Sequence, residues 1–368
     1  MEEASKMEKS YNGLLVVKAR NGNFNAGFDG NPRTLPDGTI FATDKALKYC
    51  IREYLAEFEK LPIFVRRSRR VVKSGESSKL MYQLLEENFF TKLKMLADKM
   101  DKVNDSVMNS ETKKYVKEWV DINLENIQKF EKDSKNVEKT IKDNFNSFLE
   151  DDEKVLAILK SFIDVRLFGV VFAVKGNVSL TGPVQISYGI NKLQNSSAYP
   201  VQILSPYKNP NAKVTKDDEG NEKITAQTTT GEETRADEVY YVYNISVNSS
   251  NAKETGMTNA DMELFKKALL CSVDTITSCT KYGCESVALV WLENDKKIIL
   301  NNLDEFIDIN KSEEKEVNLK LEHLKDYLSK YGFGEISKHE FSLDFDYSKI
   351  PAEKINVIYK KGKINVVE

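Results

Sequence analysis

Hydrophobic positions near the start of the chain predict a strand, a long loop and a helix. The stretch Tyr11–Ala19 (YNGLLVVKA) is rich in leucine and valine, as strands are, and the Asn- and Gly-rich stretch Arg20–Gly38 predicts a loop. Thr43 or Asp44 is placed to cap a helix that stops before Pro62. The apolar residues of this helix recur at helical spacing: Ala46, Leu47, Ile51, Tyr54, Leu55 and Phe58.

A pattern of long, charged, amphipathic helices follows from about Ser77 to Phe162. Neither glycine nor proline interrupts this stretch. We expect a helical insertion that docks on the main domain or projects from it. Its clearest apolar stripe consists of Leu80, Leu84, Leu85, Phe89, Leu93, Leu96 and Met100.

Strand-like segments return after the helical region. Phe168–Lys175 (FGVVFAVK) predicts a buried strand, and Gly182–Gly189 (GPVQISYG) predicts another. The next stretch, Asn191–Asp237, holds few large apolar residues. It contains a short alternation at Lys213–Lys216 and a turn at Asp217–Glu222, which together predict a protruding hairpin.

The remaining elements complete an α+β fold. Glu238–Val247 and Ser286–Leu292 predict strands, and Asn259–Thr275 between them predicts a helix. The tail from Lys296 mixes strand-like and helical patterns. Without the insertions, the order is strand, helix, strand, strand, helix, strand. This order is that of the ferredoxin-like or RRM-like fold.

Composition places the chain among ordinary globular proteins. Of its 368 residues, 40% are hydrophobic and 30% are charged, so it is long enough for two domains or for one domain with large insertions. The start, Met1-Glu-Glu-Ala-Ser5, does not resemble a secretory signal. The core-like run Leu167–Val174 is far shorter than the roughly 20 apolar residues that cross a bilayer. We therefore expect no membrane role.

The cysteines and histidines do not form a metal-binding pattern. Cys50, Cys271, Cys279 and Cys284 contain no Cys-x-x-Cys pair, and His323 and His339 lie well downstream of all four. We expect no metal site and no cofactor, and we expect buried, reduced thiols in a cytosolic protein.

The charge of the chain is unevenly distributed. The net charge is −3, whereas a nucleic-acid-binding domain is typically basic. Residues 1–75, however, hold 14 Lys and Arg against 9 Asp and Glu, which leaves 40 against 48 for the rest. Because attraction to phosphate acts within about 10 Å at ordinary salt, a basic face is compatible with an acidic molecule.

Several motifs then identify a resemblance. They are Asp164–Gly169 (DVRLFG), Val171–Gly176 (VFAVKG) and Ser179–Gln185 (SLTGPVQ), with weaker matches at 43–48, 51–55 and 252–256. In this order they resemble the CRISPR-associated Cas7 family, type I-B branch. The family's loop after the first strand usually has the sequence Asn-Pro-Asn-Gly-Asp-Pro. Here it is Asn21-Gly-Asn-Phe-Asn-Ala26, which keeps two asparagines and lacks both prolines.

The resemblance implies a backbone subunit of Cascade, the CRISPR interference complex. Such a subunit is cytoplasmic and non-catalytic, and it stacks head to tail on further copies of itself along the guide RNA, which pairs with a target DNA strand. It also contacts other Cascade subunits. The implied parts are an RRM-like palm (11–75, 164–189 and 238–295), helical fingers (76–163), a thumb hairpin (190–237) and a C-terminal extension packed on the palm (296–368).

Candidate RNA-binding residues come from the basic segments and the motifs. Lys45, Lys48 and Arg52 share one face of the first helix, where contacts to phosphates would hold any guide sequence; the alternative is a solvated helix face. Arg20 and Asn21 open the loop after the first strand. The densest basic cluster consists of Arg66, Arg67, Arg69, Arg70 and Lys73. The alternative is a surface loop with incidental charge, or a contact to a neighbouring acidic subunit.

For each of two further candidates, a structural role inside the protein is the alternative to RNA binding. Arg166 either contacts RNA or pairs with a carboxylate such as Asp164. Tyr188 either stacks on a splayed base or packs in the protein.

Two other functions are open at this point. An endoribonuclease of the same RNA-binding superfamily would use His323 or His339, or, if metal-dependent, Asp217 or Asp218 in the thumb. A protein-interaction module would use the helices of 77–162 and would carry no RNA. We expect no catalytic residue.

Overall fold

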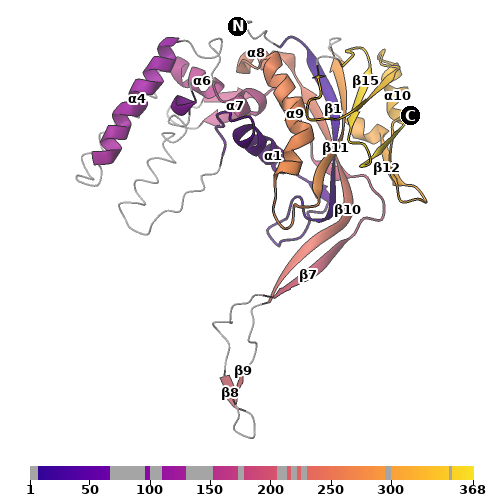
Figure 1. The fold of residues 1–368 in the computed structure, drawn as a ribbon. Coiled ribbons are helices and arrows are strands. Elements are labelled where there is room, and N and C mark those ends of the chain that lie inside the picture. The colour runs from indigo at the N-terminus through magenta and orange to yellow at the C-terminus, as the bar shows by residue number, and fades with distance from the viewer. Residues whose placement is uncertain are drawn as a thin grey trace.

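One large sheet organises the molecule, with α1 and α9 on one face and the segment from residue 300 onward on the other (Figure 1). The computed structural model describes residues 7–66, 96–99, 110–129, 152–172, 178–204, 214–216, 222–224, 230–294, 300–347 and 350–368. The helices are α1 (Asp44–Glu57), α4 (Ser110–Lys129), α6 (Asp152–Lys160), α7 (Ile163–Phe168), α8 (Ser249–Thr255), α9 (Asn259–Thr275) and α10 (Glu322–Ser329), with a 3-10 turn, η2, at Leu303–Phe306.

The strands belong to one large sheet and three small ones. The strands of the large sheet are β1 (Ser10–Gly22), β2 (Phe41–Ala42), β5 (Val184–Ile186), β6 (Gly189–Asn191), β7 (Ala198–Leu204), β10 (Thr230–Val247), β11 (Cys284–Asn294), β14 (Ile336–Glu340) and β15 (Ile355–Tyr359). The others are β3 (Gly169–Phe172) with β4 (Val178–Thr181), β8 (Val214–Lys216) with β9 (Glu222–Ile224), and β12 (Asp308–Lys311), β13 (Val317–Lys320) and β16 (Asn365–Val367).

The large sheet has the order β14-β15-β11-β1-β10-β6-β2, and β5 and β7 also pair with β10. β1 lies at its centre and pairs antiparallel with β10 on one side and with β11 on the other. Four central strands follow one another along the chain: β1, β5 with β6, β10 and β11. In the sheet the fourth of them lies beside the first, followed by the third and then the second. A helix follows the first of these strands and another precedes the fourth.

β1 is buried on both faces, which explains its unbroken apolar run. Leu15 and Val17 belong to a core with α1 and α9, whereas Leu14 and Val16 belong to a second core on the opposite face. A strand covered on both faces does not need the alternation of apolar and polar residues that a half-exposed strand shows. The sequence pattern LLVV is therefore that of a central strand.

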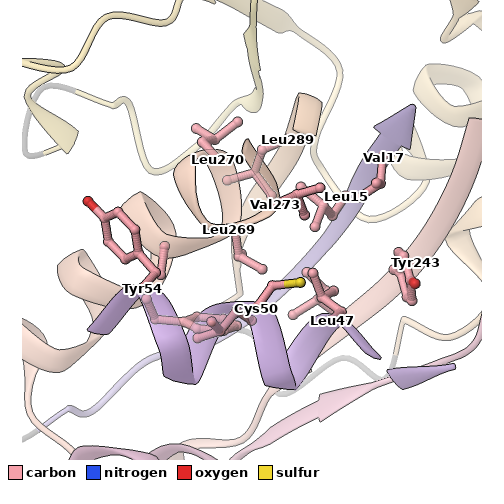
Figure 2. Packing of buried hydrophobic residues seen from close by; sticks show 14 of the residues in the cluster. Leu15, Val17, Leu47, Cys50, Tyr54, Tyr243, Leu269, Leu270, Val273 and Leu289 are labelled. Carbon is pink, nitrogen blue, oxygen red and sulfur yellow. The ribbon is translucent and has the colours of Figure 1, made fainter. Parts of the chain in front are cut away.

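The first core lies between the sheet and helices α1 and α9 (Figure 2). Leu47, Cys50 and Tyr54 of α1 and Leu269 and Val273 of α9 are buried there. Thr43 caps α1 by accepting a hydrogen bond from the backbone N–H of Ala46 (3.3 Å), as predicted from its sequence.

The second core covers the other face of the sheet with residues from 300 onward. Leu319, Leu324 and Leu328, from β13 and α10, are fully buried against Leu14 and Val290 of the sheet. Both faces of β1 are thus covered at the middle of the strand.

The helical region forms a third, smaller core. It joins α4, α6 and the segment leading into α7, where Val116, Trp119, Ile158 and Phe162 are buried together. The predicted stripe Leu80–Met100 lies outside the described residues except for Leu96, which belongs to this core.

Two strand predictions were wrong in detail. Residues 168–175 were predicted as one buried strand, but Phe168 ends α7, and Val171 is 78% exposed. Among the described residues β3 pairs only with β4, away from the large sheet, and residues 173–175 lie outside the described part of the chain. The strand predicted at 182–189 is broken into β5 and β6, because Ser187 and Tyr188 interrupt the ladder to β10.

The predicted protruding hairpin begins with β7 and the first part of β10, which pair from Ala198–Ala236 to Leu204–Thr230 and leave the sheet together (Figure 1). Farther along the same segment, β8 pairs with β9. The predicted turn lies outside the described residues apart from Glu222. Within the described part of the chain, no helix has the length and apolar character needed to cross a membrane.

Candidate nucleic-acid interface

The start of α1 presents two of the predicted cationic side chains. Lys45 is exposed, whereas Lys48 is partly buried and pairs with Asp44 (3.2 Å). The side chain of Asn25 fixes this helix end, because its Oδ1 accepts hydrogen bonds from both the N–H and the hydroxyl of Thr43, each at 2.9 Å. Asn25 lies in the loop that departs from the family pattern, and its role was missed in the sequence.

Tyr188 lies beside the segment that leads into α1. Its ring is 51% exposed and stacks on Phe41, with centroids 5.2 Å apart. Phe41 belongs to β2, which pairs with β6 and ends just before the cap of α1. The structure thus brings an exposed aromatic ring close to the helix that carries Lys45 and Lys48. These three residues are called the α1 surface below.

Arg52, the third predicted residue on this helix, has an internal partner. Its Nε donates to Oδ2 of Asp164 (3.0 Å), and its guanidinium lies 5.0 Å from the centre of the Phe168 ring. Asp164 is completely buried and also accepts the backbone N–H groups of Phe64 (2.7 Å) and Val65 (2.9 Å). Arg52 therefore neutralises a buried carboxylate that joins α1, the loop after it, and α7.

Arg166 is likewise engaged inside the protein. Its Nε and Nη2 donate to the two carboxylate oxygens of Asp261, at 2.9 and 2.7 Å, and its Nη1 donates to the carbonyl of Lys160 (2.8 Å). The carboxylate partner suggested from the sequence, Asp164, was wrong, because Arg52 and two backbone N–H groups occupy it. Asp261 also completes the capping box of α9 with Thr258.

The basic cluster after α1 is described only at its first residue. Arg66 donates from Nε and Nη2 to the carboxylate of Glu53, at 3.2 Å each, and also pairs with Glu57. Arg67, Arg69 and Arg70 lie outside the described residues.

Arg20 and Asn21 lie at the end of β1 where the β7–β10 hairpin begins. Asn21 has a positive φ of 51°; its Oδ1 accepts from the hydroxyl of Tyr199 (3.1 Å) and its carbonyl accepts from Arg235 (3.3 Å). Arg20 is exposed, and it lines a cavity with Lys18 on the sheet face opposite α1. The structure therefore does not bring Arg20 together with the α1 surface.

Phe168 is a site residue that the sequence interpretation missed. The ammonium of Lys48 lies 5.4 Å from its ring centre, beside the guanidinium of Arg52. An aromatic ring placed under two cations orders both of them through the attraction between cation and π face. Its position inside the DVRLFG motif was the available signal.

The two histidines considered for catalysis lie on different elements. His323 is exposed on α10, and Nε2 of His339 on the edge strand β14 is 3.2 Å from Oδ1 of Asn356. Asp217 and Asp218 lie outside the described residues. In the described part of the chain, no three His, Cys, Asp or Glu side chains converge as metal ligands would.

The cysteines are not all buried, contrary to expectation. Cys50, Cys271 and Cys284 are buried, and burial raises the pKa of the Cys50 thiol to about 11 and that of Cys284 to about 12. Cys279 is exposed, and its sulfur lies 3.1 Å from Nη2 of Arg235.

Comparisons with known proteins identify a family and solved structures of similar fold. A family model described as "CRISPR-associated protein Cas7" matches residues 9–330. A chain of a "CRISPR RNA-guided surveillance complex, pre-nicking" is similar with a TM-score of 0.46 and 12% identity, over 96% of this chain and 97% of that one. A chain of a "CRISPR RNA-guided surveillance complex" has a TM-score of 0.40 and 12% identity, over 88% and 83%. No curated protein matches the sequence.

Proposed function

The chain belongs to the CRISPR-associated Cas7 family, and from this premise we propose that it is a guide-RNA-binding backbone subunit of a type I CRISPR interference complex, of the I-B branch. The family match over residues 9–330 is the observation that carries the proposal, because it spans the four central strands of the sheet, the helical region and the hairpin. In this proposal the four central strands with α1 and α9 are an RRM-like palm, and β7 to β10 form the thumb.

The α1 surface is the proposed place of contact with the RNA backbone. Lys45 and Lys48 carry charges that attract phosphates whatever the base sequence, and Tyr188 offers an exposed ring on which one base can stack. Contacts of this kind suit a subunit that accepts any guide. Arg52 and Arg166 have a supporting part, since their guanidinium groups are used inside the fold.

We further propose that copies of the chain stack head to tail along one guide in the cytoplasm, beside other subunits, while the guide pairs with a target DNA strand. A contact between two different surfaces of one subunit produces an open filament instead of a closed ring. The RNA and the capping subunits then set its length.

Reversing the charge at Lys45 and Lys48 tests the RNA contact. Each lost phosphate contact lowers the slope of log affinity against log salt by about 0.7 for a single strand, so the double variant Lys45→Glu/Lys48→Glu is expected to lose about 1.4. Affinity should fall equally for guides of unrelated sequence, measured by fluorescence polarisation. Lys330→Glu, an exposed charge reversal after α10, is the control. Unequal losses, or none, contradict the proposed contact.

The proposal contains no catalytic step. Incubating the protein with its bound RNA and manganese should leave the RNA intact over hours, as seen on a denaturing gel. Cleavage that disappears with His323→Ala, His339→Ala or Asp217→Ala would instead identify an endoribonuclease.

A further inference from the structure

A basic cavity lies on the sheet face opposite the α1 surface. It has a volume of about 440 Å³ and is built from four parts of the chain: the end of β1, β10, the β12–β13 hairpin, and the turn between β15 and β16. Lys18 continues the alternation of Leu14 and Val16, so its side chain points to the same face as the second core. The cavity is therefore separated from α1 by the sheet itself.

The charges that line the cavity are mainly positive. Five cationic side chains face it against two carboxylates: Lys18, Arg20, Lys311, Lys315 and Lys363 against Glu238 and Glu316. A third carboxylate, Glu285, lies beside Lys18 and Lys363. Even when Glu285 is included, cations outnumber carboxylates.

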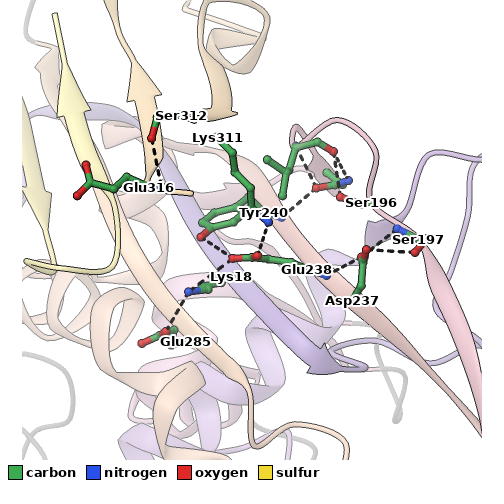
Figure 3. Close-up of polar contacts among 12 residues, drawn as sticks. Lys18, Ser196, Ser197, Asp237, Glu238, Tyr240, Glu285, Lys311, Ser312 and Glu316 are labelled. Carbon is green, nitrogen blue, oxygen red and sulfur yellow. Dashed lines mark hydrogen bonds and ion pairs between the residues drawn. The ribbon is translucent and has the colours of Figure 1, made fainter. Parts of the chain in front are cut away.

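The carboxylates at the base of the cavity hold some of the cationic side chains in place (Figure 3). Glu238 pairs with Lys311 (2.6 Å) and lies 3.7 Å from Nζ of Lys18, and it accepts a hydrogen bond from the hydroxyl of Tyr240 (3.2 Å). Burial raises the pKa of Glu238, but its contacts with Lys311 and Lys18 outweigh burial and hold the pKa below the ordinary value. The base of the cavity is thus an ordered network of opposite charges.

Two cationic side chains at the rim of the cavity remain available to bind a ligand. Among the residues that the structure describes, neither Arg20 nor Lys315 forms an ion pair, and both are exposed. The charge of Arg20 is close enough to Tyr240 to oppose the rise in the pKa of that phenol. Lys315 lies in the β12–β13 turn, where it has a positive φ of 64°, and it lines the same cavity.

We propose that this cavity is a second ligand site of the chain, in which Arg20 and Lys315, assisted by Lys363, bind a phosphate group. A guanidinium and ammonium groups in one cavity match the geometry and charge of phosphate oxygens. The source is either the backbone of a nucleic acid strand or a free phosphate. The inference goes beyond the proposed function, because the site lies on the other face of the sheet and uses the C-terminal extension.

The test compares Lys315→Glu with Lys330→Glu in the full chain. Lys330 is exposed in the same extension and lies outside the cavity. Both variants replace a lysine by a glutamate, so they change the net charge equally. The first probe is a short labelled polyuridylate RNA, for which we expect Lys315→Glu to weaken binding by roughly threefold and to lower the salt slope by about 0.7. The second probe is inorganic phosphate, read as a rise in the thermal unfolding midpoint over sodium chloride of equal ionic strength.

The outcomes separate the two sources. Loss of RNA affinity in Lys315→Glu without any effect of inorganic phosphate assigns the site to a nucleic acid strand. A phosphate-dependent rise in the midpoint of the wild type that Lys315→Glu abolishes, with unchanged RNA binding, assigns it to free phosphate. If Lys315→Glu matches Lys330→Glu in both measurements, the site does not exist. Lys45→Glu/Lys48→Glu, measured in parallel, shows whether the guide contact stands independently.

Discussion

The buried pair of Arg52 and Asp164 tests whether the cations of the motifs act inside the fold or at the RNA. Arg52→Gln removes the guanidinium that neutralises a completely buried carboxylate. Asp164 keeps its two backbone donors from Phe64 and Val65 but loses a charged partner at 3.0 Å. We expect a loss of about 1.5–3 kcal/mol in the free energy of unfolding, the contribution of a hydrogen bond to a charged group.

Asp164→Ala should cost more, about 3–5 kcal/mol, because two backbone N–H groups and the guanidinium of Arg52, whose side chain is only 15% exposed, lose their acceptor together. The double variant should cost less than the sum of the two by about 1 kcal/mol or more, since both single changes break the same bond. Urea unfolding followed by tryptophan fluorescence and circular dichroism measures all three.

Lys45→Gln is the matched control, because it removes an exposed charge from the same helix. It should leave the free energy of unfolding within about 0.5 kcal/mol of the wild type. The reasoning is refuted if Arg52→Gln is as stable as this control while its RNA affinity falls as far as that of Lys48→Glu. Arg52 would then act at the RNA and not within the fold.

Three other predictions follow from single residues. Gly182→Ala should destabilise the chain by about 1–3 kcal/mol in urea unfolding, because the added Cβ would lie 2.1 Å from the carbonyl carbon of Phe168. A thiol reagent should modify Cys279 quickly in the native protein and the three buried cysteines only after unfolding; fast modification of all four contradicts the burial. Glu238→Gln should reduce stability at neutral pH, and the difference from wild type should shrink as pH falls below 4.5, because the carboxylate has a lowered pKa in the folded state; a difference that persists in acid would contradict this.

The sequence predicted the elements whose pattern is local. The strand at Tyr11 has an unbroken apolar run, and the helix capped by Thr43 and the helix at 259–275 have helical periodicity. Each has a boundary signal within a few residues, and the structure places all three close to their predicted ends. The prediction for 168–175 was wrong about the packing of the strand, because the apolar residues of β3 pack on the helical core and not on the large sheet. An apolar run does not indicate which partner covers it.

Most of the candidate site could not be predicted from local sequence patterns. Arg52 and Asp164 are 112 residues apart, and Arg166 and Asp261 are 95 apart. A cation in a motif therefore has the same appearance in the sequence whether it binds phosphate or a distant carboxylate. Arg20 is separated from the α1 surface because its side chain lies on the face of β1 that the C-terminal extension covers. The sequence near Arg20 does not indicate which face that extension covers.

The central claim is that this chain assembles on RNA. The most direct measurement is the ratio of nucleic-acid to protein absorbance together with the light-scattering mass of the purified protein, before and after ribonuclease treatment, at low and high salt. We expect large RNA-containing particles that fall to smaller species on digestion and that dissociate as salt rises. A monomer that carries no RNA, is unchanged by nuclease and does not bind an added guide would contradict it.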